Sequence, residues 1–431
     1  MTWLPVDPSA KTTAIAMTGD LGSARAASMA FILRLQRTGA ALKTICASSY
    51  PGQDPRHRVV QIPNRMHALN RPGRTAAMDD VFEPIDSPAA WRGDELLTSP
   101  AWRRSLTNDE IAALQRATIG ARNAPLPGFG NSAFPVPELA PLFAWMIEQL
   151  ERGPGVVRLT GLPAASIARD DLKRLFWGFC VNLGMPVYQT AAGEVLGEVK
   201  DETGTGAALT YDGPGPLKSA RTIARSTGAL RFHTDKTDML CLLCATNAIE
   251  GGVSKVVSSV TLHNEIGRQR PDLLRVLYEP YWRMRPTDEE GAREDRVFPM
   301  PVFARATDGS FTSQYSRTYI SQAQEVPDVP GLTPAQIEAM DMIHAIGEDV
   351  CLRAPFEVGD MQFLNQHVTY HGRTQFTDDA ASGARRVLLR IWLAGAFTRM
   401  LPDGNAVQWG DTRAGALRGG ALVGRSALVD A

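Results

Sequence analysis

The chain has 431 residues, of which 44% are hydrophobic and 21% are charged, so it holds enough apolar material for a globular core. Its 45 basic and 46 acidic side chains leave a net charge of -1, which excludes the basic surface of a general nucleic-acid binder. No apolar run is long enough for a membrane helix, and five scattered cysteines form no disulfide framework, so we expect a cytoplasmic protein.

Residues 1–77 differ in composition from the rest of the chain. They hold ten basic side chains and three acidic ones, whereas the remaining residues hold 35 basic and 43 acidic ones. Such a segment is typical of a leader, or of a reading frame begun at a start codon placed too early. We expect residues 1–77 to be disordered and to take no part in catalysis; a surface arm of the main domain is the alternative.

Residues 78–155 are expected to form an extension of helices and loops. Ala121–Pro137 is rich in proline, glycine and asparagine, which favours a connection without regular structure. Leu139–Leu150 carries apolar residues at helical spacing and is predicted to be a helix.

Residues 156–400 are predicted to be the catalytic domain, and residues 401–431 a C-terminal tail. The long polar stretch Glu202–Leu230 separates a first part, which contains a predicted strand and helix, from a second half that is mostly strand. Several strands joined by long excursions predict a mainly β protein with helices (α+β), built on a jelly roll. We expect strands at Val156–Leu159, Met239–Cys244, Val253–Val260, Phe356–His367 and Arg385–Phe397, and helices at Asp171–Leu183, Pro271–Leu277 and after the Thr333 capping box.

A candidate metal site begins at His233 and Asp235. In an extended segment, side chains two positions apart project to the same side, so the imidazole and the carboxylate can converge on one point. A second histidine from a distant strand would complete the two-His, one-carboxylate arrangement that binds non-haem Fe(II), and His371 is the candidate. By itself this pair is a weak motif, since most such pairs are surface or capping residues.

Two arginines lie in a segment that we expect to be buried. Strand alternation over residues 386–392 places Arg386, Leu388, Arg390 and Trp392 on one face, and both faces are largely apolar. A buried guanidinium requires an anion, which is either an internal carboxylate or the carboxylate of a ligand.

The order of five motifs resembles the Fe(II)/2-oxoglutarate-dependent dioxygenases of the TauD/TfdA (taurine dioxygenase-like) family. The resemblance spans residues 156–397 and includes FHTD at 232–235, GGVS at 251–254, GDMQFLN at 359–365, HGRT at 371–374 and RRVLLRIWL at 385–393. It implies a double-stranded β-helix (jelly roll) with helical insertions.

The resemblance also implies a role for individual residues. His233, Asp235 and His371 would bind iron, while Ser254 and Arg386 would contact the distal carboxylate of 2-oxoglutarate. Arg390 would meet the co-substrate or the substrate. His367 is the alternative to His371, which is preferred because glycine and arginine follow it in the family pattern.

The implied reaction consumes O2 and 2-oxoglutarate, releases succinate and CO2, and oxidises an unactivated C–H bond of a small organic substrate. Tyr315, Arg317 and Tyr319 alternate in a predicted strand and could form a wall for an anionic or zwitterionic molecule; a packing ladder is the alternative. Trp282, Arg283 and Arg285 form a second basic-aromatic group without an assigned role.

Two other functions remain open. One is a jelly-roll metal or ligand-binding protein without oxidative activity. The other is an oxygenase that modifies nucleic acid or protein, which the acidic balance of residues 78–431 disfavours. We therefore expect a small-molecule substrate, no nucleic-acid or membrane partner, and allow a homo-oligomer. Cys241 and Cys244 form a CxxC in a predicted buried strand, where packing is the better explanation than zinc or redox chemistry.

Overall fold

The computed structural model describes residues 80–202, 224–285, 295–379, 381 and 383–421. The chain divides into two units, 1–69 and 70–431, and every described residue belongs to the second. The predicted leader at residues 1–77 and most of the polar stretch after Glu202 lie outside the described residues.

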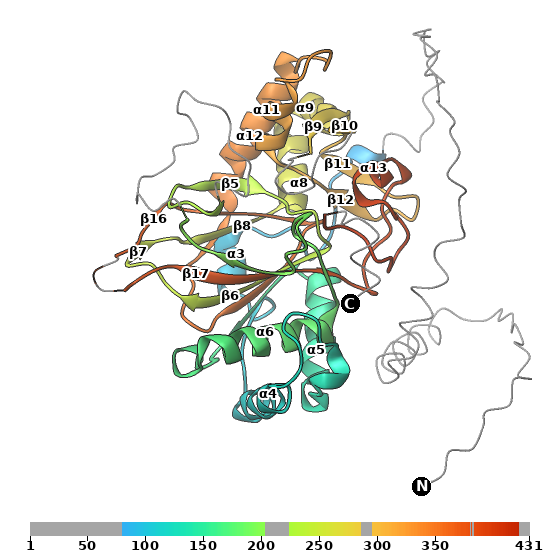
Figure 1. Ribbon diagram of the computed structural model, residues 1–431. Coiled ribbons are helices and arrows are strands. Elements are labelled where there is room, and N and C mark those ends of the chain that lie inside the picture. Colours follow the sequence, from blue (N-terminus) through green and yellow to red (C-terminus); the bar gives the residue numbers. More distant parts are fainter. Residues whose placement is uncertain (1–79, 203–223, 286–294, 380, 382, 422–431) are drawn as a thin grey trace, which may run out of the picture. The chain divides into compact units, whose positions relative to one another are not determined.

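Two β-sheets form the centre of the described unit (Figure 1). The larger sheet has the order β1 (Arg103–Ser105), β2 (Val156–Thr160), β14 (Met361–Asn365), β6 (Met239–Thr246), β17 (Val387–Ala394) and β3 (Met185–Val187), and β4 (Leu196–Val199) also pairs with β17. The smaller sheet has the order β13 (Leu352–Ala354), β8 (Ser254–Ser258), β15 (Thr369–Arg373) and β5 (Leu230–His233). One apolar cluster joins Leu240 and Leu364 of the larger sheet to Val256 and Leu352 of the smaller one, so the sheets pack face to face. The predicted α+β jelly roll is confirmed.

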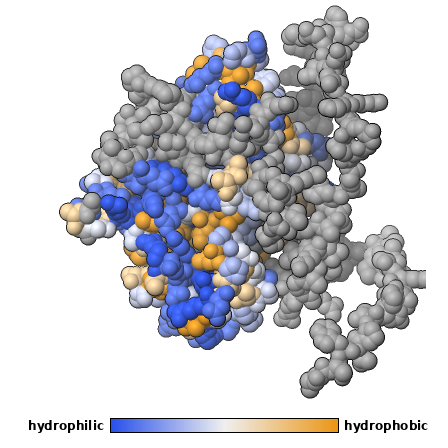
Figure 2. All heavy atoms as spheres, in the orientation of Figure 1, coloured by the Kyte–Doolittle hydropathy of each residue, from blue (hydrophilic) through white to orange (hydrophobic). Residues whose placement is uncertain are grey.

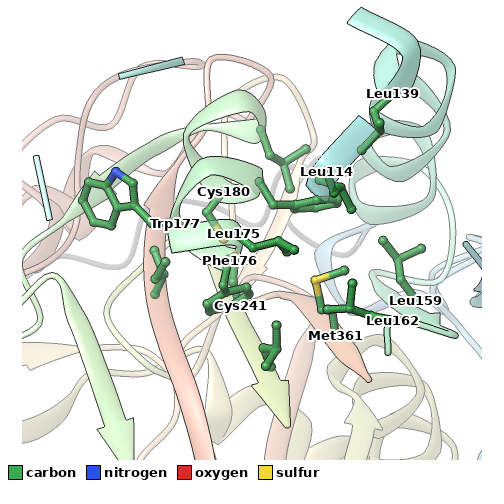
Figure 3. Close-up of a cluster of buried hydrophobic side chains, with 14 of the residues drawn as sticks. Leu114, Leu139, Leu159, Leu162, Leu175, Phe176, Trp177, Cys180, Cys241 and Met361 are labelled. Carbon is green, nitrogen blue, oxygen red and sulfur yellow. The ribbon is translucent and has the colours of Figure 1, made fainter. Parts of the chain in front are cut away.

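Helices cover the outer face of each sheet (Figure 1). The larger sheet packs against α4 (Asn108–Gly120), α5 (Ala140–Glu151) and α6 (Arg169–Leu183). Figure 3 shows part of this buried cluster, with Leu114 of α4 and Phe176 of α6 near Met361 of the sheet. The smaller sheet packs against α8 (Ser259–Gln269), α9 (Pro271–Leu277), α11 (Arg317–Ala323) and α12 (Pro334–Val350). The remaining helices in the described ranges are α3 (Gly93–Thr98), α13 (Ala406–Trp409) and the short 3-10 turns η2 (Asp80–Phe82), η3 (Asn131–Ala133), η4 (Pro137–Leu139), η5 (Ala164–Ser166) and η6 (Asp403–Asn405).

Within the described residues, three short strand pairs lie outside the two main sheets. They are β9 (Tyr281–Met284) with β10 (Val297–Met300), β11 (Phe303–Arg305) with β12 (Phe311–Ser313), and β7 (Glu250–Gly251) with β16 (Phe376–Thr377). The pair of β9 and β10 is important below because it carries a buried arginine.

Local signals in the sequence set the helix ends. The Thr333 hydroxyl accepts from the Gln336 backbone N–H at 3.2 Å, and the Gln336 side chain accepts from the Thr333 N–H at 3.0 Å. This is the expected capping box of α12. Helices α5, α6 and α9 also lie where the sequence predicts helices.

The strand predicted at residues 253–260 is too long. It ends at Ser258, whose hydroxyl accepts from the Thr261 N–H at 2.9 Å and so caps α8. Val260 therefore belongs to a helix. Its β-branched side chain matches a strand pattern, but the cap at Ser258 decides the local structure.

Cys241 and Cys244 are buried in β6, and all described cysteines are free. Burial raises the pKa of Cys244 to about 12, so its thiol stays protonated. These two residues act as small apolar groups in the core.

The described part of the segment expected as a C-terminal tail packs against the core. Trp409 is buried, and the Gly420 N–H donates to the Lys236 carbonyl at 2.7 Å. The described surface visible in Figure 2 mixes hydrophilic residues with smaller hydrophobic areas. Among the described helices, none combines the length and the hydropathy that crossing a bilayer requires.

Candidate metal centre and adjoining pocket

The smaller sheet brings His233 and His371 side by side. His233 ends β5 and His371 lies in β15, and the two residues are direct antiparallel partners. Their ring centroids are 4.2 Å apart. Because this proximity follows from strand pairing, main-chain hydrogen bonds fix the separation of the two imidazoles.

Asp235 completes the group. Its Oδ1 lies 3.8 Å from Nε2 of His233, and its Oδ2 lies 3.9 Å from Nε2 of His371. One potential ligand atom from each residue lies within 4.8 Å of the other two. Two imidazoles and one carboxylate at this spacing could hold one divalent metal ion with further positions open.

Neighbouring groups orient these three side chains. Nδ1 of His233 lies 2.9 Å from the Arg231 carbonyl, so Nδ1 carries the proton and Nε2 keeps its lone pair for a metal. The Asp235 N–H donates to the Gln366 side chain at 2.7 Å. Burial, followed by the neighbouring His233, lowers the pKa of His371 to about 3, so this imidazole is neutral.

Two residues of β17 contact the Asp235 carboxylate. The Trp392 indole N–H donates to Oδ2 at 3.0 Å, and Nη1 of Arg390 lies 3.8 Å from the same oxygen. Burial would raise the pKa of Asp235, but the Arg390 charge and the hydrogen bond from the Trp392 indole favour the ionised form, and the pKa is lowered. Asp235 is therefore ionised, as a metal ligand must be.

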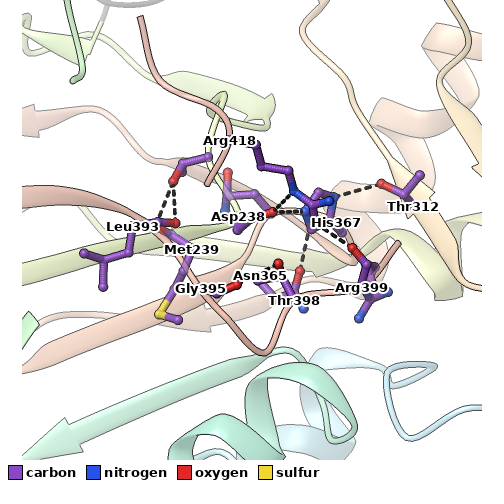
Figure 4. A network of polar contacts seen from close by, with 12 residues as sticks. Asp238, Met239, Thr312, Asn365, His367, Leu393, Gly395, Thr398, Arg399 and Arg418 are labelled. Atoms are coloured by element: carbon purple, nitrogen blue, oxygen red, sulfur yellow. Dashed lines mark hydrogen bonds and ion pairs between the residues drawn. The ribbon is translucent and has the colours of Figure 1, made fainter. Parts of the chain in front are cut away.

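His367 does not join this group. Its Nε2 lies 2.7 Å from Oδ1 of Asp238, and its Nδ1 lies 2.9 Å from the Thr312 hydroxyl (Figure 4). Arg418 donates to the same Asp238 oxygen at 2.8 Å, and the side chains of all three residues in this ion-paired set are inaccessible to solvent. Both ring nitrogens of His367 are thus engaged in a structural network, which leaves His371 as the histidine beside His233.

Arg386 and Ser254 lie at the ends of two strands. Ser254 begins β8, and its hydroxyl accepts from the Gln362 side chain at 3.2 Å. Arg386 immediately precedes β17 and is 2% exposed, and its Nε has no hydrogen-bond partner among the described residues. Gly252 packs so closely on this guanidinium that a Cβ there would lie 2.8 Å from Nε. Burial lowers the pKa of Arg386 to about 10, which leaves it charged at neutral pH and in need of an anion.

The predicted strand containing Tyr315, Arg317 and Tyr319 is wrong. Strand β12 ends at Ser313 and α11 begins at Arg317, so the three side chains do not share a strand face. Tyr315 and Tyr319 nevertheless line a pocket together with His233 and Asp235. Arg317 is absent from that lining and forms an ion pair with Asp341 at 2.5 Å.

Sequence reasoning left three contributors to this region without a role. Trp392 was expected on the arginine face but not as a partner of Asp235, and Gln362 lies in a motif without an assigned contact. Arg283 lines the pocket from β9. The alternation of aromatic and basic residues at 281–285 was the available signal for Arg283, but it did not distinguish which of the basic residues faces inward.

Comparisons with known proteins agree with this architecture. The family model described as taurine catabolism dioxygenase TauD, TfdA family matches residues 122–392. FR-33289 synthase from Streptomyces rubellomurinus is 25% identical over 342 residues, which cover 76% of this chain and 96% of that protein. The taurine hydroxylase-like protein SAT17 from Stachybotrys chartarum is 25% identical over 314 residues, covering 71% and 79% of the two chains.

A solved structure also shares the fold. Asparagine oxygenase in complex with Fe(II), 2S,3S-3-hydroxyasparagine and succinate aligns with a TM-score of 0.51 and 14% sequence identity. The alignment covers 68% of this chain and 93% of that one.

Proposed function

The chain belongs to the TauD/TfdA family of taurine catabolism dioxygenases, and we propose that it oxidises an unactivated C–H bond of a small anionic or zwitterionic organic substrate. As a member of this family it is a non-haem iron dioxygenase that depends on 2-oxoglutarate. When bound, Fe(II) and 2-oxoglutarate supply, with O2, the oxidising power for the reaction, and succinate and CO2 are the co-products. The protein must bind, orient and shield the reactants.

The observation that carries the proposal is the convergence of His233, Asp235 and His371. Their donor set matches Fe(II), because imidazole and carboxylate are the ligands of the facial two-His, one-carboxylate site. We assign iron binding to these three residues. The Arg231 carbonyl and the Trp392 indole would hold His233 and Asp235 in their ligating orientations.

We assign the distal carboxylate of 2-oxoglutarate to Arg386 and Ser254. Arg386 supports this role because it is buried and its Nε has no hydrogen-bond partner in the described part of the chain. The Ser254 hydroxyl already accepts from Gln362, which leaves its own O–H to donate. The Gln362 carbonyl in turn accepts from buried Arg158 at 2.6 Å, so the Gln362 amide is held in one orientation.

Arg390 is proposed to contact the co-substrate or the substrate, since its guanidinium reaches the edge of the metal group. Tyr315 and Tyr319 are proposed as substrate-facing residues because they line the pocket beside His233. Arg317 has no comparable support. Its predicted role depended on a strand that does not form, so it is retained only as a control in the experiments below.

The test is anaerobic addition of Fe(II) and 2-oxoglutarate to the full chain, followed by visible spectroscopy. We expect a weak charge-transfer band in the parent protein. His233→Ala, Asp235→Ala and His371→Ala should abolish the band, whereas His344→Ala, at an exposed position of α12, should preserve it. A parent protein without the band, or a band that survives in the three ligand variants, would contradict the proposal.

A metabolite screen scored by succinate release then identifies the substrate. A protein that binds small molecules but forms no succinate with any of them would instead be the non-oxidative jelly-roll protein.

A further inference from the structure

Arg283 places a buried positive charge in the wall of the pocket beside the metal group. It lies in β9, opposite Phe298 of β10, and the residue is only 5% exposed to solvent. The pocket that it lines is the one bounded by His233, Asp235 and Tyr315. The strand pair of β9 and β10 therefore delivers a guanidinium to the metal site from outside the two main sheets.

The hydrogen bonds of Arg283 do not neutralise its charge. Its Nη2 donates to the Pro301 carbonyl at 2.8 Å, while its Nε is buried without a partner among the described residues. No described carboxylate forms an ion pair with it. The titratable groups that influence it are the hydroxyls of Tyr370, Tyr281 and Tyr315, all of which are neutral at physiological pH.

Burial lowers the pKa of Arg283 to about 10, which still leaves the side chain protonated near neutrality. A buried cation without a counter-ion is strongly unfavourable, so such a group usually marks the binding position of an anion.

Other arginines in this region show the usual way of satisfying the charge. Arg285, two residues further on, lies 3.4 Å from the Asp295 carboxylate and stacks on Phe298. Arg317 pairs with Asp341. Arg283 differs from both because it is in the pocket lining and lacks an acidic partner in the described structure.

We propose that Arg283 anchors the substrate by binding its oxyanion group, a carboxylate, phosphonate or sulfonate, in the pocket beside the metal group. This inference rests on the proposed function and narrows it to substrates with such a group. With the anion held by Arg283 on one wall and the metal ligands on another, the distance between the two selects which carbon is presented for oxidation. Tyr315, Phe298 and Trp392 line the same pocket and supply aromatic surface for the body of the molecule.

The experiment is anaerobic equilibrium dialysis with defined probes against protein that holds Fe(II) and one equivalent of 2-oxoglutarate. The probes are propionate, methylphosphonate and methanesulfonate, with propionamide as the neutral counterpart of propionate. The proteins are the parent, Arg283→Gln, Arg283→Lys and the matched control Arg317→Gln.

We expect the parent and Arg317→Gln to bind at least one of the three anions. If the carboxylate is the group recognised, both proteins should bind propionamide at least tenfold more weakly than propionate. Arg283→Gln should lose at least tenfold in anion affinity. Arg283→Lys should lose less, because it keeps the charge but not the planar fork. The three anions distinguish a carboxylate from a phosphonate or sulfonate site.

Three results would overturn the inference: no anion bound by the parent, propionamide bound as tightly as every anion, or Arg283→Gln equal to the parent. Because Arg283→Gln could unfold, its charge-transfer band and its circular dichroism are compared with those of the parent, and Arg283→Lys gives a second test. The dialysis is also repeated with metal-free protein, so that the proposed function and the role of Arg283 can fail separately. A missing charge-transfer band in the parent would reject the oxygenase. The metal-free dialysis would still test anion binding by Arg283.

Discussion

The Trp392 indole N–H donates to Oδ2 of Asp235 at 3.0 Å, so a residue in the larger sheet orients a carboxylate that follows a strand of the smaller one. Both sheets thus contribute residues to the metal group, in addition to packing against each other. Hydrogen bonds of this kind hold a ligand in its binding orientation before the metal arrives.

Trp392→Phe is expected to weaken Fe(II) binding about tenfold, because the aromatic body remains while the hydrogen bond to Asp235 is lost. The measurement is an anaerobic Fe(II) titration followed through the charge-transfer band. Trp145→Phe, at a partly buried position of α5, is the control and should leave the titration unchanged. Identical iron affinities for Trp392→Phe and the parent would remove the orienting role from this hydrogen bond.

Arg386→Ala is expected to raise the apparent KM for 2-oxoglutarate by about tenfold or more, since a hydrogen-bonded charge is lost from a buried position. Iron affinity should stay unchanged. Arg353→Ala, which removes an exposed arginine paired with Glu348, is the matched control. An unaltered KM in Arg386→Ala would assign the co-substrate carboxylate to another cation.

Arg418→Gln is expected to lower the free energy of unfolding by about 3 kcal/mol, because it leaves the buried Asp238 carboxylate without its guanidinium partner. Chemical denaturation measures the loss. Arg413→Gln removes an arginine from an exposed pair with Asp411 and should leave the unfolding transition in place. Equal transitions for both variants would mean that the buried network is not stabilising.

The buried imidazole of His263 is expected to lower the free energy of unfolding as the pH falls. Burial, with a smaller contribution from Arg305, lowers its pKa from the ordinary value of 6.5 to about 4, despite a hydrogen bond to Asn264. The unfolded chain therefore binds a proton first as pH falls below 6.5. The stability present above that pH is lost progressively toward pH 4, by about 3 kcal/mol in total.

Chemical denaturation between pH 7 and pH 4 measures this effect. His263→Phe should make this part of the pH dependence shallower without abolishing it, because His367 and His371 also have lowered pKa values. The site accepts an aromatic ring, since Tyr278, Phe303 and Phe311 surround it. Burial also lowers the pKa of His344, but this residue lies at an exposed position, so His344→Ala should change the profile less than His263→Phe. A parent-like slope in His263→Phe would assign the pH dependence to other groups.

The sequence predicts most regular elements because their signals are local. The capping box at Thr333 and the apolar spacing of α5 and α6 depend on neighbouring residues alone. The three proposed iron ligands were identified because their motifs occur in a fixed order along the chain.

Other features depend on tertiary contacts that a sequence pattern does not contain. Residues 314–319 alternate as a strand would, yet Arg317 begins α11, a helix without a side-chain cap whose own Thr318 and Ile320 are buried. Arg283 and Arg285 have similar local sequences, and only the fold shows that Arg283 lines the pocket without an acidic partner among the described residues, while Arg285 pairs with Asp295.

The link between Asp238 and Arg418 joins residues 180 positions apart. The loop that carries Asp235 also carries Asp238, so it is stabilised by the Arg418 side chain, which is synthesised long after the loop itself. Its fully supported form can arise only once synthesis has passed Arg418, so we expect a nascent chain to acquire a tight iron site at a late stage of its production.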